Sequence, residues 1–213
     1  MIRFITFEGG DGTGKTTQIR GLEGYLRDRS CTCVVTREPG ATALGKLLRD
    51  VLLKVGDAEI ASSTELFLYL ADRAQHVKEV ILPAMASGKL VLCDRFTDST
   101  LAYQGYGRGL DLDWLRKLNE MAAAQITPDL TFLFDCPVEI GLARAAQRGA
   151  HSTIAPREDR FEREKLAFHE RVRRGFLELA SSHPHRFRII DASGSVEHSA
   201  KQIRAIIDQE VVQ

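Results

Sequence analysis

The chain has 213 residues, and its 29 lysines and arginines balance 29 aspartates and glutamates, so the formal net charge is zero. A neutral chain has no long-range attraction for nucleic acids or membrane surfaces, and we predict neither as a partner. The apolar runs are too short to span a bilayer, and the first residues run straight into a predicted strand rather than a signal peptide. We therefore expect one cytoplasmic domain over residues 1–213.

Short apolar runs alternate with helical patterns along the whole chain. The predicted strands lie near residues 3–8, 32–36, 90–94, 130–135 and 187–190. The helical patterns lie near residues 15–28, 42–54, 64–87, 111–124, 138–147, 159–181 and 196–211. This alternation predicts an α/β fold with a parallel sheet and helices on both faces. In such sheets the ligand crevice lies at the carboxyl ends of the strands.

The first strand is followed by GGDGTGKT, residues 9–16, which fits the phosphate-loop pattern GxxxxGK[ST]. Glycines allow the backbone N–H groups to turn inward around an anion, and the next helix adds its positive end. Lys15 is expected to reach the terminal phosphates, and the Thr16 hydroxyl to hold Mg²⁺. Asp11 would repel a triphosphate unless its side chain points elsewhere.

The second and third strands also end in polar residues. TREPGAT, residues 36–42, leaves Arg37 and Glu38 at the predicted crevice, although it could be an ordinary strand-to-helix connection. LVLCDR ends in Asp94 and Arg95. An acid beside a phosphate loop suits a metal shell, and an arginine there can clamp a phosphate, although a solvated ion pair is the alternative.

Two later segments suggest contacts with a planar base. In the helix predicted over 64–87, Phe67 and Arg73 have the chemistry to stack on a base and contact it, although a phenylalanine on such a helix more often belongs to the core. Residues 96–110 are too polar and glycine-rich for a core element, and we predict a surface loop. In that loop Tyr103 could crowd a ribose and Gln104 could contact a base edge, or the segment could merely connect two elements.

Residues 144–163 carry Arg144, Arg148, Arg157, Arg160 and Arg163 around small residues. In a phosphoryl-transfer enzyme such a segment is typical of a closing lid, here about residues 148–160, that neutralises charge in the transition state. The alternative is a solvated helix start, because acidic residues alternate with the arginines.

Taken together, these blocks resemble the thymidylate (dTMP) kinases, the bacterial ones in particular. The likeness covers almost the whole chain: FEGGDGTGKTTQ, TREPGAT, ELFLYLADRAQHV, LCDRFTDSTLAYQGYGRG, LFDCPVEIGLARAAQRG and DRFE, in that order. It implies a three-layer P-loop NTPase fold with a five-stranded parallel sheet and a short arginine-containing lid. It also implies ATP-dependent phosphorylation of dTMP to dTDP, Mg²⁺ as cofactor and a homodimer.

The resemblance also implies a role for each matching residue. Some relatives have an arginine where this chain has Gly12, so the lid is expected to supply the transition-state arginines from Arg148, Arg157 and Arg160. The implied catalytic residues are Lys15, Arg95, Asp11, Arg148 and Arg160. Those implied to bind ATP are Gly9, Gly10, Asp11, Gly12, Thr13, Gly14, Lys15, Thr16, Arg144 and Arg148. Those implied to bind dTMP are Asp11, Glu38, Arg49, Phe67, Arg73, Arg95, Thr100, Tyr103 and Gln104, with Thr16 and Asp94 at the metal.

Two other functions remain open from the residues alone. Another nucleoside or nucleoside monophosphate kinase could share this fold, and a nucleoside kinase could use Glu8 or Glu38 as the base that deprotonates a 5′-hydroxyl. A GTP-driven switch or binding module could use the same loop, although the chain has no NKxD-type guanine signature.

Overall fold

A computed structural model describes residues 2–53, 59–150 and 160–211, with the backbone alone at 148–150. In this part of the chain five parallel strands form one sheet in the order β2-β3-β1-β4-β5. Their bounds are β1 Phe4–Gly9, β2 Cys33–Arg37, β3 Leu90–Asp94, β4 Leu130–Asp135 and β5 Phe187–Asp191. The predicted α/β class is confirmed, because every predicted strand is present and the pairing is parallel throughout.

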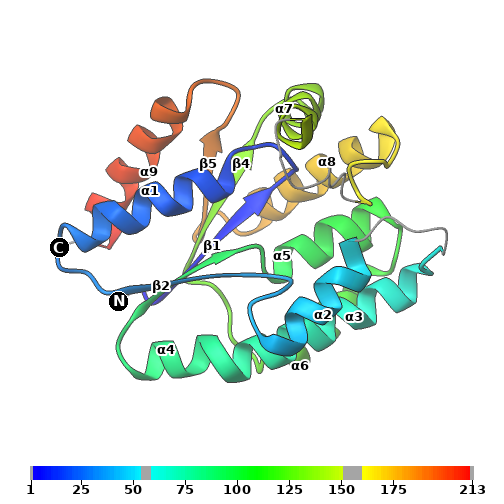
Figure 1. Ribbon diagram of the computed structural model, residues 1–213, viewed down its shortest axis with the longest axis horizontal. Coiled ribbons are helices and arrows are strands. Elements are labelled where there is room, and N and C mark those ends of the chain that lie inside the picture. Colours follow the sequence, from blue (N-terminus) through cyan, green and yellow to red (C-terminus); the bar gives the residue numbers. More distant parts are fainter. Residues whose placement is uncertain (1, 54–58, 151–159, 212–213) are drawn as a thin grey trace.

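Alternating side chains of the central strands divide the core into two layers. Ile5 and Phe7 of β1 face α1 (Lys15–Arg27) and α9 (Val196–Glu210), which lie together against one side of the sheet (Figure 1). Phe4 and Leu133 face the opposite layer. That layer is formed by α3 (Ser62–His76), η1 (Val77–Ile81), α4 (Leu82–Ala86), α6 (Leu112–Ala122) and α8 (Leu166–Ser182).

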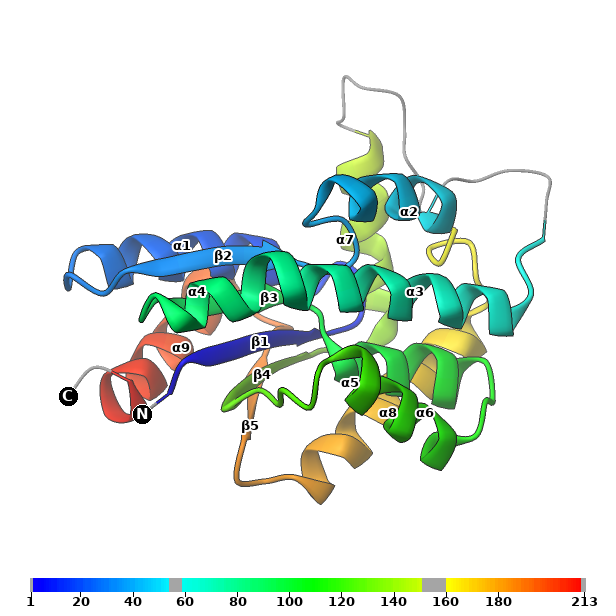
Figure 2. The same ribbon diagram turned by 90° about the horizontal axis from the view of Figure 1, so that it is seen from below.

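Two further helices, α2 (Ala43–Leu53) and α7 (Val138–Ala150), lie beyond the carboxyl ends of the strands. Figure 2 shows both on the side where β1 ends, and α2 packs against α3. They border the crevice that the parallel sheet predicts. No helix in the described ranges is both long and apolar enough to cross a membrane.

The segment predicted as a polar surface loop, residues 96–110, is different in the structure. It forms α5 (Thr97–Thr100) and the π-helical η2 (Leu101–Gly107), and most of it is buried. The glycines that suggested a loop instead permit close packing: a Cβ on Gly107 would lie 2.7 Å from the Phe168 ring of α8. The prediction of a loop was wrong because these glycines and polar groups serve tertiary contacts.

The other differences are at helix ends. The helix predicted over 64–87 is present but contains the π-helical η1 between α3 and α4. The pattern over 159–181 becomes α8, which begins at Leu166 after Lys165 in an extended conformation. The single-domain prediction stays a prediction, although the described ranges share one sheet.

Candidate active site

The loop after β1 has the backbone of a phosphate cradle. Gly9, Gly12 and Gly14 have φ values of 132°, 73° and 88°, which only glycine adopts easily. Gly14 in the left-handed conformation starts α1, so the loop ends at a helix N-terminus. A Cβ at Gly9 would lie 2.4 Å from the Phe134 carbonyl oxygen of β4, so glycine is required there for packing as well.

Lys15 is buried and lies across the loop that it follows. Its Nζ donates to the carbonyl oxygens of Gly9 at 3.0 Å and Gly10 at 2.7 Å, and to Thr13 Oγ1 at 3.3 Å. Burial, helped by the nearby Arg95 charge, lowers the pKa of Lys15 to about 8. A bound triphosphate would replace these carbonyl contacts with charged ones.

The predicted metal pair is brought together. Thr16 Oγ1 donates to Asp94 Oδ2 at 3.0 Å, across the gap between α1 and the end of β3. A hydroxyl and a carboxylate are hard oxygen ligands that suit Mg²⁺, which usually takes most of its other ligands from water and phosphate. Among the described residues no group of three or more His, Cys, Asp or Glu could form a separate metal cage.

Asp11 points toward the end of β3 rather than into the phosphate cradle. Its Oδ1 accepts from Arg95 Nη2 at 2.7 Å, and its Oδ2 accepts from Tyr103 Oη at 3.2 Å. Although burial acts to raise it, the Arg95 and Lys15 charges hold the pKa of Asp11 below its usual range. The repulsion expected between this carboxylate and a triphosphate is thereby avoided.

Arg95 is held in a strained position beside the loop. It has a φ of 70°, uncommon for a residue with a side chain, and its Nη1 donates to the Gly9 carbonyl at 3.0 Å and to Ser99 Oγ at 3.2 Å. The guanidinium also lies 4.9 Å from the centre of the Tyr103 ring. These contacts fix a positive charge where β3 ends, directly against the phosphate loop.

Glu8, the last side chain before the loop, is fully buried. Its Oε1 accepts from the Phe96 backbone N–H at 2.7 Å and its Oε2 from Ser99 Oγ at 2.5 Å. Burial and the neighbouring Asp98 charge raise the pKa of Glu8 to about 7. The Glu8 carboxylate therefore holds the turn after β3 in place.

A second buried network is centred on Arg73 of α3. Arg73 is 1% exposed and donates through Nε to Glu38 at 2.9 Å, through Nη1 to Thr100 at 2.9 Å and to Asn119 at 2.5 Å, and through Nη2 to the Phe96 carbonyl at 3.0 Å. The other oxygen of Glu38 lies 2.9 Å from His76 Nδ1. Arg73 and Glu38, each implied by the resemblance to bind dTMP, are therefore bonded to each other, and both face protein groups.

Arg49 and Gln104, also implied by the resemblance to bind dTMP, both contact protein groups. Arg49 Nη1 donates to the Pro39 carbonyl at 2.8 Å, and its side chain packs where a Cβ on Gly40 would be. Gln104 is 2% exposed and its Nε2 donates to Glu65 at 2.8 Å. Arg49 therefore lies beside the turn after β2, while Gln104 belongs to η2 and contacts α3.

Phe67 does not lie on the face of α3 that carries Arg73. Its side chain belongs to the outward stripe with the exposed Ala71 and Ala74, it is 52% exposed, and its ring contacts Trp114 edge to face at 6.3 Å. The aromatic residue one helical turn before Arg73 is Tyr69, which shares its face at i and i+4. Tyr69 lies near Phe161, which also contacts Tyr103. Tyr69, rather than Phe67, is therefore the aromatic residue on the Arg73 face of α3.

The predicted lid lies largely outside the described residues, and this includes Arg157 and the side chain of Arg148. Arg144 donates to three carbonyl oxygens after β5, those of Ala192 at 2.6 Å, Ser193 at 2.8 Å and Gly194 at 3.0 Å. Arg160 donates to the Leu52 carbonyl at 3.1 Å and pairs with the buried Glu65 of α3. In this structure Arg160 therefore anchors its segment to α2 and α3 rather than facing the phosphate loop.

Gly12 is fixed by its neighbour in α7. A Cβ at Gly12 would lie 1.8 Å from the Gly141 carbonyl oxygen, and a Cβ at Gly141 would lie 2.5 Å from the Asp11 carbonyl oxygen. The loop and the helix thus touch through backbone alone. The position that carries an arginine in some relatives has no room for a side chain here.

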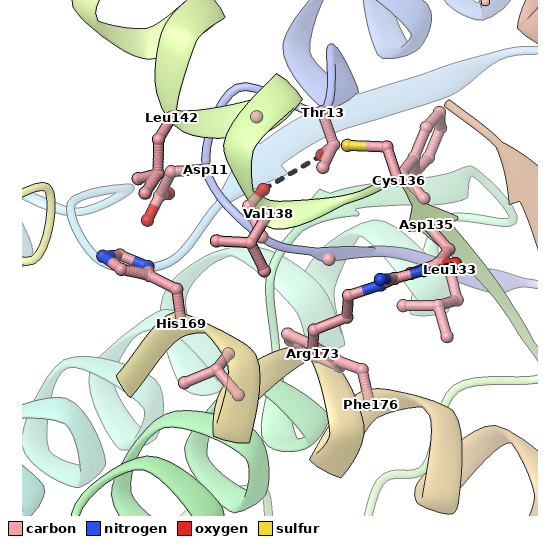
Figure 3. A pocket seen from close by; sticks show the side chains of 15 residues that line it. Asp11, Thr13, Leu133, Asp135, Cys136, Val138, Leu142, His169, Arg173 and Phe176 are labelled. Carbon is pink, nitrogen blue, oxygen red and sulfur yellow. Dashed lines mark hydrogen bonds and ion pairs between the residues drawn. The ribbon is translucent and has the colours of Figure 1, made fainter. Parts of the chain in front are cut away.

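A pocket lies behind the loop, between the end of β4, the start of α7 and α8 (Figure 3). His169 extends from α8 toward Asp11, and Arg173 Nε meets Asp135 Oδ1 at 2.7 Å. His169 is 6% exposed, and its Nε2 is buried without a hydrogen-bond partner among the residues that the structure describes. Burial lowers the pKa of His169 below its usual range.

The sequence reasoning missed Tyr69, Glu65 and His76. Tyr69 and Glu65 lie four and eight residues before Arg73 along α3, and His76 lies three residues after it. All except Tyr69 are fully buried. Helical spacing could have found them.

The loop, the lysine, the strand-end acid and the sheet order together define a P-loop NTPase that transfers phosphoryl groups. Comparison with known proteins narrows this class, because the family model described as thymidylate kinase matches residues 7–203. The chain belongs to the thymidylate kinase family.

Curated relatives agree over nearly full length. The chain is 56% identical to the thymidylate kinase of Geobacter sulfurreducens over 96% of this chain and 95% of that protein. It is also 56% identical to that of Desulfovibrio desulfuricans, over 96% and 94%. Among solved structures, a crystal structure of thymidylate kinase from Ehrlichia chaffeensis superposes with a TM-score of 0.76 at 32% identity, covering 97% of this chain and 98% of that one.

Proposed function

We propose that the chain transfers the γ-phosphoryl group of ATP in line to dTMP, giving ADP and dTDP. The observation that carries the proposal is the contact between the donor and acceptor sides. Arg95 donates both to the Gly9 carbonyl of the phosphate loop and to Asp11, and Tyr103 donates to the same carboxylate. A phosphate held by Arg95 would therefore lie against the end of the donor cradle.

The chemistry requires alignment more than proton transfer. A phosphate monoester has a second pKa near 6, so the acceptor is largely dianionic at neutral pH and is already a nucleophile. Lys15 and Arg95 supply fixed positive charge along the line of transfer, and the loop N–H groups hold the donor phosphates. Mg²⁺, held through Thr16 and Asp94, would add charge neutralisation on the ATP phosphates.

The buried carboxylates argue against a nucleoside kinase. Such an enzyme needs a base that can reach a 5′-hydroxyl. Glu8 already accepts from the Phe96 N–H and Ser99, and Glu38 from Arg73 and His76. Both are at most 4% exposed, so neither is placed to deprotonate a substrate. This favours a monophosphate as the acceptor.

We place the thymine base on Tyr69. This ring lies on the face of α3 between Glu65 and Arg73. Glu65 contacts Gln104 of η2, and Arg73 contacts Thr100 of α5. Tyr103, next to Gln104 in the chain, would lie against the deoxyribose with Asp11 beside it. Arg49, next to the turn at Pro39, would face the acceptor phosphate from the other side.

We also propose a homodimer through an apolar face on α2, α3 and α6. Leu44, Leu47 and Val51 form an exposed stripe along α2, which packs against α3. Phe67 of α3 and Trp114 of α6 continue that surface, and the exposed Ala71 and Ala74 of α3 allow close helix approach. Figure 2 shows the three helices together at one side of the molecule. Large exposed apolar surfaces of this kind mark interfaces.

Product analysis tests the proposed reaction. The purified chain is incubated with ATP, Mg²⁺ and dTMP, and nucleotides are separated by ion-exchange chromatography. We expect equal amounts of ADP and dTDP, and at least a roughly 10²-fold lower rate for Arg95→Ala, because one fixed donor is lost. Formation of ADP without dTDP would contradict the proposal.

A further inference from the structure

Glu65 is a fully buried carboxylate that receives hydrogen bonds from three residues in two other parts of the chain. Its Oε1 accepts from Gln104 Nε2 at 2.8 Å and Arg108 Nε at 3.3 Å, and its Oε2 accepts from Arg108 Nη2 at 3.2 Å and from Arg160. Arg108 also pairs with Glu164. A buried carboxylate requires such partners, so Glu65 is a connecting point between α3, η2 and the segment before α8.

The carboxylate determines which way the Gln104 amide faces. A carboxylate between two arginines accepts hydrogen bonds and donates none, so Gln104 must turn its NH₂ group toward Glu65. The carbonyl oxygen Oε1 is then directed away from Glu65. The amide, which could otherwise adopt either orientation, is fixed by a residue outside the binding pocket.

Two contacts between α3 and the 97–107 segment flank Tyr69. Thr100 bonds Arg73, four residues after Tyr69, and Gln104 bonds Glu65, four residues before it. A base stacked on Tyr69 lies between these two contacts and presents one edge to η2. The side-chain carbonyl oxygen of Gln104 therefore faces that edge of the base.

We propose that Glu65 is a positioning residue for base selection. By fixing Gln104 with Oε1 outward, it provides an acceptor for the N3–H of thymine. Cytosine has a lone pair at N3 and would face that oxygen with repulsion. The proposal rests on the function proposed above and on Tyr69 as the base platform.

The test compares two neighbouring carboxylates. Glu65→Gln lets the Gln104 amide rotate, because a glutamine can donate as well as accept. Glu164→Gln also removes a negative charge from Arg108 but has no recorded bond to Gln104 within the described residues. The ratio of kcat/KM for dTMP to that for dCMP is measured for each variant at fixed ATP, after wild-type turnover of dTMP is established.

We expect Glu65→Gln to lower this ratio by about tenfold or more, mainly through a higher KM for dTMP, while Glu164→Gln keeps the wild-type ratio. An unchanged ratio in a folded Glu65→Gln protein would overturn the proposal. Equal losses in the two variants would overturn it as well, since they would indicate a general effect of the cluster.

A second set of variants covers the case in which Glu65→Gln does not fold. Gln104→Met keeps the volume and removes the amide, and it should lower the ratio as Glu65→Gln does. In the Gln104→Met background Glu65→Gln should have no additional effect on the ratio. A wild-type ratio in Gln104→Met would overturn the proposal. Absence of dTDP formation by the wild type would instead contradict the proposed function.

Discussion

Asp11 connects the two halves of the active site. Its backbone belongs to the phosphate loop, while its side chain accepts from Arg95 and Tyr103. Because Arg95 also bonds the Gly9 carbonyl, the position of its guanidinium is tied to the phosphate loop through two short contacts. In the proposed reaction these few fixed side chains would align donor and acceptor.

Tyr69→Ala should weaken dTMP binding by roughly 1–3 kcal/mol, the usual cost of losing one base–aromatic stacking contact. The dissociation constant for dTMP can be measured by calorimetry without ATP. Phe67→Ala is the matched control, since Phe67 lies on the outward side of α3 and should not change this constant. The opposite result, with Phe67 sensitive and Tyr69 neutral, would restore the sequence-based assignment.

ATP binding should depend on pH through Lys15. Its pKa is lowered to about 8 in the free protein by burial and Arg95, and bound phosphates should raise it. Above pH 8 the lysine must gain a proton as ATP binds, so affinity should fall by up to about tenfold per pH unit. Below that pH the lysine is already protonated, and affinity should not depend on this group.

Calorimetry near pH 9, in two buffers of different ionisation enthalpy, measures that proton uptake. Lys15→Arg, which keeps its charge at this pH, should show none. Constant ATP affinity from about pH 7 to 9, without proton uptake by the wild type, would rule out this role for the lysine.

At the scale of elements, the phosphate loop and α7 meet through two glycines. A Cβ on Gly12 would clash with a backbone carbonyl oxygen of α7, and a Cβ on Gly141 would clash with one of the loop. This contact fixes the start of α7, from which Arg144 reaches the carbonyls after β5. Three segments therefore meet here: the loop and α7 through their glycines, and α7 and the segment after β5 through the Arg144 side chain.

Gly141→Ala should displace the loop, because the new Cβ would lie 2.5 Å from the Asp11 carbonyl oxygen. We expect a loss of about 1–3 kcal/mol in unfolding free energy, typical of overpacking, and a fall in kcat/KM for ATP. Denaturant titration and steady-state kinetics measure the two effects. Gly21→Ala in α1 is the control: nothing lies within 4 Å of its Cβ position, so stability should stay equal or rise. Wild-type behaviour of Gly141→Ala would show that the contact is dispensable.

The features that could be predicted from sequence are those encoded by neighbouring residues. The strands, the glycine loop and the positions of Thr16, Asp94 and Arg95 beside that loop follow from local patterns and from the rule that parallel strands end together. The burial of η2 could not be predicted, because Gly107 packs against Phe168 and Val172 of α8, far away in sequence. The pairing of Arg160 with Glu65 is equally long-range, and a run of arginines does not reveal which partner each one has.

At the scale of the whole molecule, the apolar face on α2, α3 and α6 lies on the outer side of the helix that carries Tyr69, Glu65 and Arg73. One side of α3 would then line the base pocket, and its other side would lie in the dimer interface. A partner subunit would hold α3 in place without contributing to the pocket.

Leu47→Glu should convert a dimer to a monomer, because Leu47 is 66% exposed in the middle of the α2 stripe and a buried unpaired charge is costly. Sedimentation velocity measures the oligomeric state. Leu82→Glu is the matched control, since Leu82 is 43% exposed on α4 away from this face. A dimer that survives Leu47→Glu but dissociates with Leu82→Glu would place the interface elsewhere.

We propose that this enzyme phosphorylates an acceptor that already carries a phosphate. Steady-state kcat/KM with ATP and Mg²⁺, measured side by side for dTMP and thymidine, tests it most directly. We predict efficient turnover of dTMP and turnover of thymidine lower by a factor of at least about 10², because thymidine lacks the group that Arg95 holds and Glu8 and Glu38 cannot serve as its base. Thymidine turned over as well as dTMP, or in preference to it, would contradict the account.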